Sequence, residues 1–149
     1  MNHLNLAQQI AAVRRFNRFY TRQIGVLQKG LLESDYSLAE VRVLYELAQR
    51  RECAAVELQR ELGLDAGYLS RIIRSFKRRR LVNRRNSKAD GRQSILSLTT
   101  KGQDVFVDLN TRANDEIAAH LHGRSLADQR RLTDAMRTIE EILAKKDTP

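Results

Sequence analysis

Proline is missing from the body of this chain, and its absence constrains the fold more than any other feature of the sequence. The only proline among 149 residues is Pro149, and the seven glycines are scattered. Because proline and clustered glycine interrupt helices most strongly, their absence from the body of the chain permits long helices. At this length one domain with a hydrophobic core is expected, and the sequence predicts that it is mostly helical.

Basic residues gather in one window of the chain, residues 71–92. Of the chain's 27 Lys and Arg the window holds ten, and of its 18 Asp and Glu it holds one, Asp90; the other 127 positions carry 17 of each sign and sum to zero. A solvated charge run usually interleaves both signs to limit self-repulsion, and this window does not. Such a local field favours a polyanionic partner, with nucleic acid first. The ten basic residues are Arg71, Arg74, Lys77, Arg78, Arg79, Arg80, Arg84, Arg85, Lys88 and Arg92.

Cysteine and histidine are too few for a disulfide framework or a multi-cysteine metal site. Cys53 is the only cysteine, and His3, His120 and His122 do not form a convincing ligand set. We therefore expect no cofactor and no metal, with Cys53 a small buried residue; an oxidation sensor is the alternative. No apolar run is long enough to span a membrane and no signal peptide follows Met1, which favours a cytoplasmic protein.

A regular apolar seam predicts a long helix from about Leu4 to Leu32. Its positions step by four and three residues alternately, which is a heptad pattern. One position in the seam is polar, Asn17, and we expect it to fix register or partner; a satisfied core amide and a ligand contact are the alternatives. The seam consists of Leu6, Ile10, Val13, Asn17, Tyr20, Ile24, Leu27 and Leu31.

Capping signals divide the next part of the chain into three shorter helices. Ser37 and Glu40 form a capping box, which predicts a helix start. A helix over about 54–62 is expected to stop at Gly63, a natural left-handed position, and Asp65 is expected to cap the next one. Two helices joined by such a turn predict a helix-turn-helix. Its second helix has the apolar face Leu69, Ile72, Ile73 and Phe76, and the helix after Ser37 has the apolar face Val41, Leu44, Tyr45, Leu47 and Ala48.

An alternating pattern after residue 80 predicts a β-hairpin. Its strands would be residues 81–85 and 94–98, joined by a polar and basic turn. Next to a helix-turn-helix, such a hairpin is a wing. From Thr99 on the apolar period is helical again, with a break at Gly123, after which Ser125 opens the last helix. The expected fold class is therefore mainly α with a small β-wing: a winged helix-turn-helix flanked by N- and C-terminal dimerisation helices.

Four short motifs carry a resemblance to the MarR family of winged-helix regulators over essentially the whole chain. Asp90-Gly91-Arg92 matches the family's Asp-x-Arg motif of the wing. Leu98-Thr99-Thr100-Lys101-Gly102 resembles its Leu-Thr-x-x-Gly motif at the start of the dimerisation helix. The turn and the recognition helix of the family are similar to Leu62-Gly63-Leu64-Asp65 and Leu69-Ser70-Arg71-Ile72-Ile73.

The resemblance implies a single MarR-type domain over residues 1–149. Its DNA-binding lobe would be residues 34–98, and its dimerisation helices would be residues 1–33 and 99–146. A homodimer also fits the residues themselves, because the heptad stripe and the two apolar faces after Thr99 exceed what one winged helix can cover.

The basic window and the resemblance together indicate which residues would contact DNA. A helix start offers N–H groups to phosphate, and Gly67 would let the backbone approach closely. Arg71 and Arg74 are candidates for guanine contacts, because a guanidinium pairs bidentately with O6 and N7. Arg92 is expected to enter the minor groove; Asp90 would anchor the wing arginines, form a tight turn, or both. Tyr68 and Ser70 would contact bases or phosphates, and the expected phosphate contacts are Lys77, Arg78, Arg84, Arg85 and Lys88.

The resemblance also implies an effector pocket between the dimerisation helices and the DNA-binding lobe, often for small aromatic acids. Cationic and aromatic side chains would bind such a ligand, although the same residue types also serve in cores and on surfaces. The candidates are Arg14, Arg18, Tyr20, Tyr36 and Tyr45.

The function that follows is a homodimeric, sequence-specific DNA-binding transcriptional regulator, a repressor on an inverted-repeat operator that a small-molecule effector releases. The alternative is the DNA-binding regulatory domain of a longer protein, since residues 13–22 and 64–71 resemble MarR-type domains that are sometimes fused to a GNAT acetyltransferase. An RNA-binding module would interleave aromatic with basic residues. An enzyme would need a nucleophile, paired carboxylates or a metal set, and none is evident, so we expect no enzyme.

Overall fold

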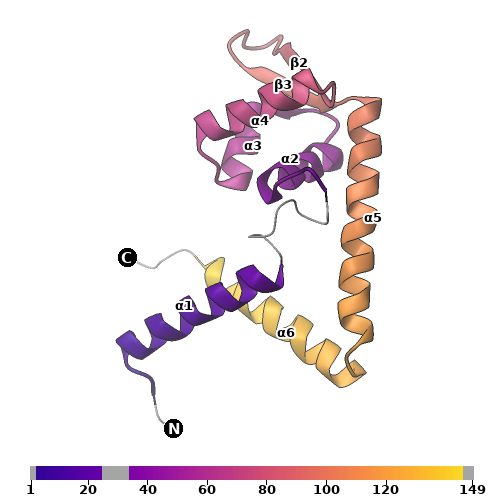
Figure 1. The fold of residues 1–149 in the computed structure, drawn as a ribbon. Helices are drawn as coiled ribbons and strands as arrows, with labels where there is room; N and C mark the ends of the chain where they lie inside the picture. The colour runs from indigo at the N-terminus through magenta and orange to yellow at the C-terminus, as the bar shows by residue number, and fades with distance from the viewer. Residues whose placement is uncertain (1–2, 25–33, 146–149) are drawn as a thin grey trace. The chain divides into compact units, whose positions relative to one another are not determined.

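The computed structural model describes residues 3–24 and 34–145 of the chain (Figure 1). Its elements in chain order are α1 (Leu6–Gln23), α2 (Leu38–Gln49), β1 (Cys53–Ala54), α3 (Ala55–Leu62), α4 (Ala66–Arg78), β2 (Val82–Asn86), β3 (Ser94–Leu98), α5 (Thr100–His122) and α6 (Leu126–Leu143). This mostly helical fold with a small antiparallel sheet confirms the predicted fold class. The chain divides into two compact units, residues 1–110 and 111–149, and the division falls within α5.

The core of the first unit is formed by α2, α3, α4, the sheet and the start of α5. α4 buries the whole apolar face that its period predicts. The prediction for α2 is wrong at Tyr45, which is 45% exposed, while Val43 is fully buried. The ring of Tyr45 lies edge-on to that of Phe106 in α5, with centroids 6.1 Å apart, so a neighbour distant in sequence covers only one side of it. The buried residues of this core are Val43, Leu44, Leu47, Cys53, Leu58, Leu69, Ile72, Ile73, Phe76, Leu81, Val82, Leu96 and Leu109.

The three strands pair antiparallel in the order β1–β3–β2. β2 and β3 form the predicted hairpin, with Val82 opposite Leu98 and Asn86 opposite Ser94. β1 is not evident in the sequence, because two residues are too few to show an alternating pattern. It forms where Cys53 pairs with Leu96, and both side chains are buried.

Local side-chain caps set several helix boundaries, as the sequence predicts. Ser37 and Glu40 form the capping box at the start of α2. The side chain of Asp65 accepts from the N–H of Tyr68 at 3.1 Å, and Ser125 caps α6 in the same way. Gly63 ends α3 with φ 62°, a left-handed conformation that glycine adopts without steric cost.

α4 ends in a turn that usually contains glycine. The N–H of Leu81 donates to the carbonyl of Phe76, and the N–H of Arg80 donates to the carbonyl of Lys77. These two bonds define a Schellman motif, in which Arg80 takes the left-handed position with φ 58°. A side chain with a Cβ is strained there.

Arg80→Gly should therefore raise the free energy of unfolding by about 1 kcal/mol, because glycine reaches this φ without strain. Urea unfolding followed by circular dichroism would measure the change. Arg80→Ala removes the same charge but keeps the Cβ, so it should bring no such gain. Equal stability of the two variants would contradict the strain argument.

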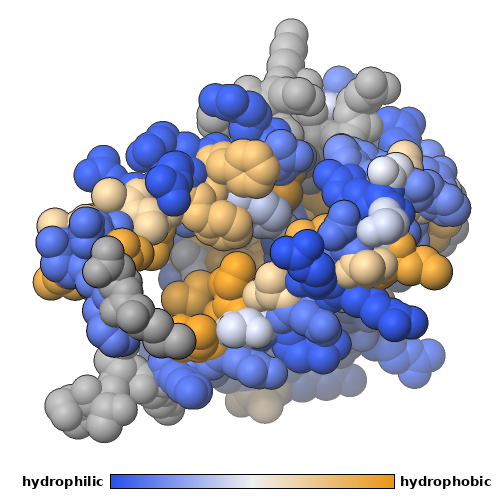
Figure 2. All heavy atoms as spheres, turned by 90° about the horizontal axis from the view of Figure 1, so that it is seen from below, coloured by the Kyte–Doolittle hydropathy of each residue, from blue (hydrophilic) through white to orange (hydrophobic). Residues whose placement is uncertain are grey.

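α1 and α6 have no buried residues in the single chain. α1 begins at a capping box formed by Asn5 and Gln8, and it carries the predicted seam; Leu27 and Leu31 lie outside the described residues. Figure 2 shows hydrophobic side chains at the surface on one face of the molecule. In the described parts of the chain, no helix combines the length and apolarity needed to cross a membrane. The large exposed apolar residues of these two helices include Leu6, Ile10, Val13, Phe16, Phe19, Leu126, Leu132, Ile139, Ile142 and Leu143.

Candidate nucleic-acid interface

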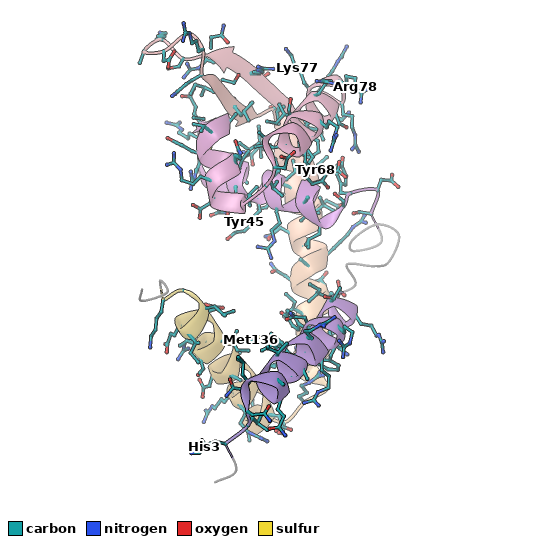
Figure 3. All side chains as sticks on the ribbon, turned by 90° about the vertical axis from the view of Figure 1, so that its left-hand side faces the viewer. His3, Tyr45, Tyr68, Lys77, Arg78 and Met136 are labelled. Carbon is teal, nitrogen blue, oxygen red and sulfur yellow. The ribbon has the colours of Figure 1, made fainter. Side chains whose placement is uncertain are left out.

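α4 presents two exposed faces, and the predicted contact residues divide between them. Ser70, Arg74 and Lys77 lie on the face that turns toward the hairpin and line a groove there. Arg71 and Arg78 lie seven residues apart on the neighbouring face. Figure 3 shows Lys77 and Arg78 near one end of α4 and Tyr68 toward the other.

The start of α4 is shaped by its cap. A Cβ on Gly67 would lie 3.2 Å from Oδ2 of Asp65, the atom that accepts from the N–H of Tyr68. Gly67 therefore leaves room for the cap, and the close approach of a partner at this position stays a prediction. The guanidinium of Arg71 lies over the Tyr68 ring, 5.7 Å from its centroid. This cation–π contact orients Arg71 on the open face of the helix.

A groove of about 510 Å³ separates α3 and α4 from the hairpin. Its cations come from α4, from β2 and from the turn of the hairpin, and none of its lining residues is acidic. Because positive charges here lie beside low-dielectric walls, the groove concentrates a positive potential suited to a phosphate backbone. The basic lining residues are Arg74, Lys77, Arg84 and Arg92, and the apolar ones are Ala55, Val56, Ala66, Leu69, Ile73 and Leu96.

Arg84 and Arg85 are adjacent in sequence, but their side chains lie on opposite faces of the hairpin. Arg84 is opposite Leu96, and its Nε donates to Oγ of Ser94 at 2.9 Å, so its side chain lies on the groove side. Arg85 points to the other face because side chains alternate along a strand. There Nη2 of Arg85 lies 2.6 Å from Oε2 of Glu52. Both were predicted phosphate contacts, and the structure brings only Arg84 to the groove.

Asp90 organises the backbone at the tip of the wing. Its Oδ1 accepts from the N–H of Arg92 at 3.0 Å, and its carbonyl accepts from the N–H of Gln93. The hydroxyl of Ser87 accepts from the N–H groups of Ala89 and Asp90. These bonds form the tight turn that the sequence allows, and they fix the backbone that carries Arg92. Lys88 is exposed in the same turn.

Arg79 belongs to the basic window, but its side chain contacts other residues of the lobe. Its guanidinium lies 4.3 Å from the centroid of the Tyr36 ring and 3.8 Å from Oε2 of Glu40. The Tyr36 ring in turn lies edge-on to Phe76. This cluster ties the end of α4 to the start of α2. The sequence shows no sign of it, because the partners are about forty positions apart.

The three predicted effector tyrosines have aromatic partners of their own. Tyr20 stacks on Phe16 within α1, Tyr36 lies between Arg79 and Phe76, and Tyr45 contacts Phe106. Arg14 and Arg18 are exposed on α1. A shared effector pocket stays a prediction.

Cys53 is buried beside a cluster of charged side chains. Burial raises the pKa of the Cys53 thiol, and the hydrogen bond that Nη1 of Arg50 donates to Sγ at 3.7 Å opposes this rise. Arg50 also lies within 4.0 Å of three carboxylates, which links the end of α2 to α3. Among the described residues, no group of three ligating side chains is placed to hold a metal ion. The carboxylates around Arg50 are those of Glu46, Glu57 and Glu61.

Comparison with known proteins agrees with this geometry. The family model of the MarR family matches residues 34–93. No curated protein matches the sequence.

Solved structures of similar fold cover most of the chain. One is a mutant MarR from E. coli complexed with operator DNA, with a TM-score of 0.73 and 20% identity over 91% of this chain and 99% of that one. Another concerns regulation of DNA binding of Bordetella bronchiseptica BpsR by 6-hydroxynicotinic acid, with a TM-score of 0.70 and 20% identity over 89% and 98%. A third is the PcaV transcriptional regulator from Streptomyces coelicolor with its natural ligand, with a TM-score of 0.68 and 20% identity over 95% and 98%. These similarities show a common fold over most of the chain.

Proposed function

Residues 34–93 of the chain belong to the MarR family, and on that premise we propose that the protein is a homodimeric, sequence-specific DNA-binding transcriptional regulator. The observation that carries the proposal is the groove between α4 and the hairpin, which is lined by four cations and no acid. A polyanion is the partner that such a groove favours. The presence of operator DNA in the similar E. coli MarR structure supports double-stranded DNA as that polyanion.

In the proposed complex, α4 enters the major groove and the hairpin flanks it. Arg71, on the open face of α4, contacts a guanine edge, and Tyr68 beside it contacts a base or a phosphate. Arg74 lies in the groove with the wing cations, which favours a phosphate contact for it instead of the predicted base contact. Arg92, held on the ordered turn, enters the minor groove. The remaining phosphate contacts are Lys77, Arg78, Arg84 and Lys88.

The regulatory part of the proposal is a repressor that a small aromatic or anionic effector releases from DNA. Two similar structures support this part: that of BpsR, whose DNA binding is regulated by 6-hydroxynicotinic acid, and that of PcaV in complex with its natural ligand. In the same proposal, residues 34–98 form the DNA-binding lobe, and residues 1–33 and 99–146 form the dimer.

A dimer is expected because α1 and α6 have no buried residues in the single chain and leave a row of large apolar side chains exposed. Light scattering at micromolar concentration should give a mass of two chains per particle, about twice 17.2 kDa. A second copy covering these helices would bury the exposed seam. A clean monomer would contradict both the dimer and the paired DNA complex.

Arg71→Ala and Arg92→Ala should weaken DNA binding in different ways. Loss of a base contact at Arg71 should reduce the free energy of binding to the selected operator by about 1–3 kcal/mol. It should also relax the base preference at one symmetric position of that operator. Loss of Arg92 should weaken binding chiefly where the flanks are A·T-rich, because the minor groove is narrow there.

The measurement is fluorescence anisotropy on a duplex selected from a random pool and on its base-substituted forms. Arg131→Ala is the matched control, since Arg131 lies on α6 with its side chain 84% exposed. It removes the same charge outside the lobe and should change affinity little. Uniform weakening on all duplexes by both lobe variants would reduce Arg71 and Arg92 to phosphate contacts.

A further inference from the structure

The ion pair between Arg85 and Glu52 is a feature of the basic window that the proposed DNA complex leaves unused. Its atoms lie 2.6 Å apart, the distance of a short charge-assisted hydrogen bond. The two residues are 33 positions apart, so the fold brings this acid from outside the basic window to the wing.

The pairing of the strands explains how this contact arises. Ala54 of β1 and Arg85 of β2 both pair with Ile95 of β3, so the three residues form one row across the sheet. Paired residues in antiparallel strands point to the same face, so Ala54 and Arg85 share one face of the sheet. Glu52 lies in the bend just before β1, and its carboxylate meets the Arg85 guanidinium on that face. Arg85 reaches Glu52 across β3, on the face opposite to the Arg84 side chain and the groove.

We propose that Glu52 withholds Arg85 from DNA, so that each wing contacts the phosphate backbone with one cation fewer than its sequence offers. The inference rests on the proposed function. A carboxylate held this close competes directly with phosphate for the same N–H donors. Both side chains are about half exposed, at 48% and 53%, so the pair is within reach of solvent and the released guanidinium is free to reorient. Glu52 is therefore a positioning residue that sets the sequence-independent part of DNA affinity.

Glu52→Gln tests this idea because it removes the charge and keeps the size of the side chain. Binding to a selected duplex and to an unrelated duplex of equal length should strengthen alike, by about threefold per wing, since the new contact is to phosphate. The slope of log K against log[salt] should become more negative by about 0.9 per wing. Arg85→Gln alone should change little, and Glu52→Gln with Arg85→Gln should lose the whole gain.

Two controls separate this effect from the general field of the protein. Glu57→Gln removes an equally exposed carboxylate, at 55%, that lies near Arg50 and not near Arg85. Any gain it brings should persist when Arg85 is replaced. Arg84→Gln removes the groove-side cation and should reduce the salt slope in the wild-type background.

The outcomes are distinct. The proposal is overturned if Glu52→Gln brings no gain, if the gain survives loss of Arg85, or if Arg85→Gln alone weakens binding as much as Arg84→Gln. Elution from a heparin column gives a readout that needs no operator, and Glu52→Gln should elute at higher salt only while Arg85 is present. If wild-type protein binds no duplex, the proposed function fails, and the heparin shift alone decides whether Glu52 withholds Arg85 from a polyanion.

Discussion

Gly102→Ala is expected to lower the free energy of unfolding by about 3 kcal/mol, at the upper end of what overpacking usually costs. A Cβ at this position would lie 2.1 Å from the carbonyl oxygen of Leu81 and 3.2 Å from Cδ2 of Leu98. The first contact is with backbone, so no side-chain rotation relieves it. The start of α5 would have to move away from the lobe.

The surrounding hydrogen bonds show why such a movement is unfavourable. Oγ1 of Thr99 donates to the carbonyl of Arg80 at 2.6 Å and accepts from the N–H of Gly102 at 3.0 Å. The N–H of Thr99 donates to the carbonyl of Leu81. The Leu-Thr-x-x-Gly motif therefore has a physical role here: threonine caps α5 and glycine lets the helix abut the turn after α4.

Urea unfolding would measure the change, with Gly123→Ala as the matched control. A Cβ at Gly123 would have its nearest neighbour at 3.8 Å, an ordinary van der Waals contact. This variant should stay within about 0.5 kcal/mol of the parent protein. If both variants unfold at the same urea concentration as the parent, the close approach of α5 to Leu81 does not restrict the fold.

Operator affinity is expected to fall roughly 500-fold between 50 and 200 mM salt, in line with counterion release from DNA. In the proposed complex each lobe offers five phosphate contacts, because the proposed role of Glu52 removes Arg85 from the set. If about half of the ten in a dimer engage, log K against log[salt] has a slope near −4.5. The five contacts per lobe are Arg74, Lys77, Arg78, Arg84 and Lys88.

The proposed dimer should select an inverted repeat, because a two-fold axis would relate its two recognition helices. The half-sites should be centred roughly 10 bp apart, which places successive major grooves on one side of the duplex. Selection from random duplexes followed by a salt series measures both quantities. Asymmetric selected sites, or a slope near zero, would contradict a symmetric complex in which the groove of each protomer binds the DNA backbone.

Several parts of the fold were predictable because they depend on neighbours in sequence. A capping box joins residues three positions apart, so Ser37 and Glu40 were sufficient to locate the start of α2. The period of α4 identified its buried face, and the helix proved to bury all four residues. The hairpin was evident from alternation and a polar turn.

The candidate site was predictable only in part. Nothing local distinguishes Arg84 from Arg85, and the strand register alone places them on opposite faces. Arg79 looked like the other cations of the window, yet it stacks on Tyr36. Tyr45 had the spacing of a core residue, and its actual exposure depends on Phe106 of α5.

By itself, the sequence determined the helices, the hairpin and the place of the positive charge, because caps, hydrophobic periods and charge density act over a few residues or a few turns. The tertiary structure alone decided which cations line the groove and which are paired with carboxylates elsewhere. Glu52 and Glu40 reach Arg85 and Arg79 only after distant segments pack together, and Gly102 is constrained only where α5 meets Leu81. These contacts join residues 21 to 39 positions apart, which no local pattern in a single sequence reports.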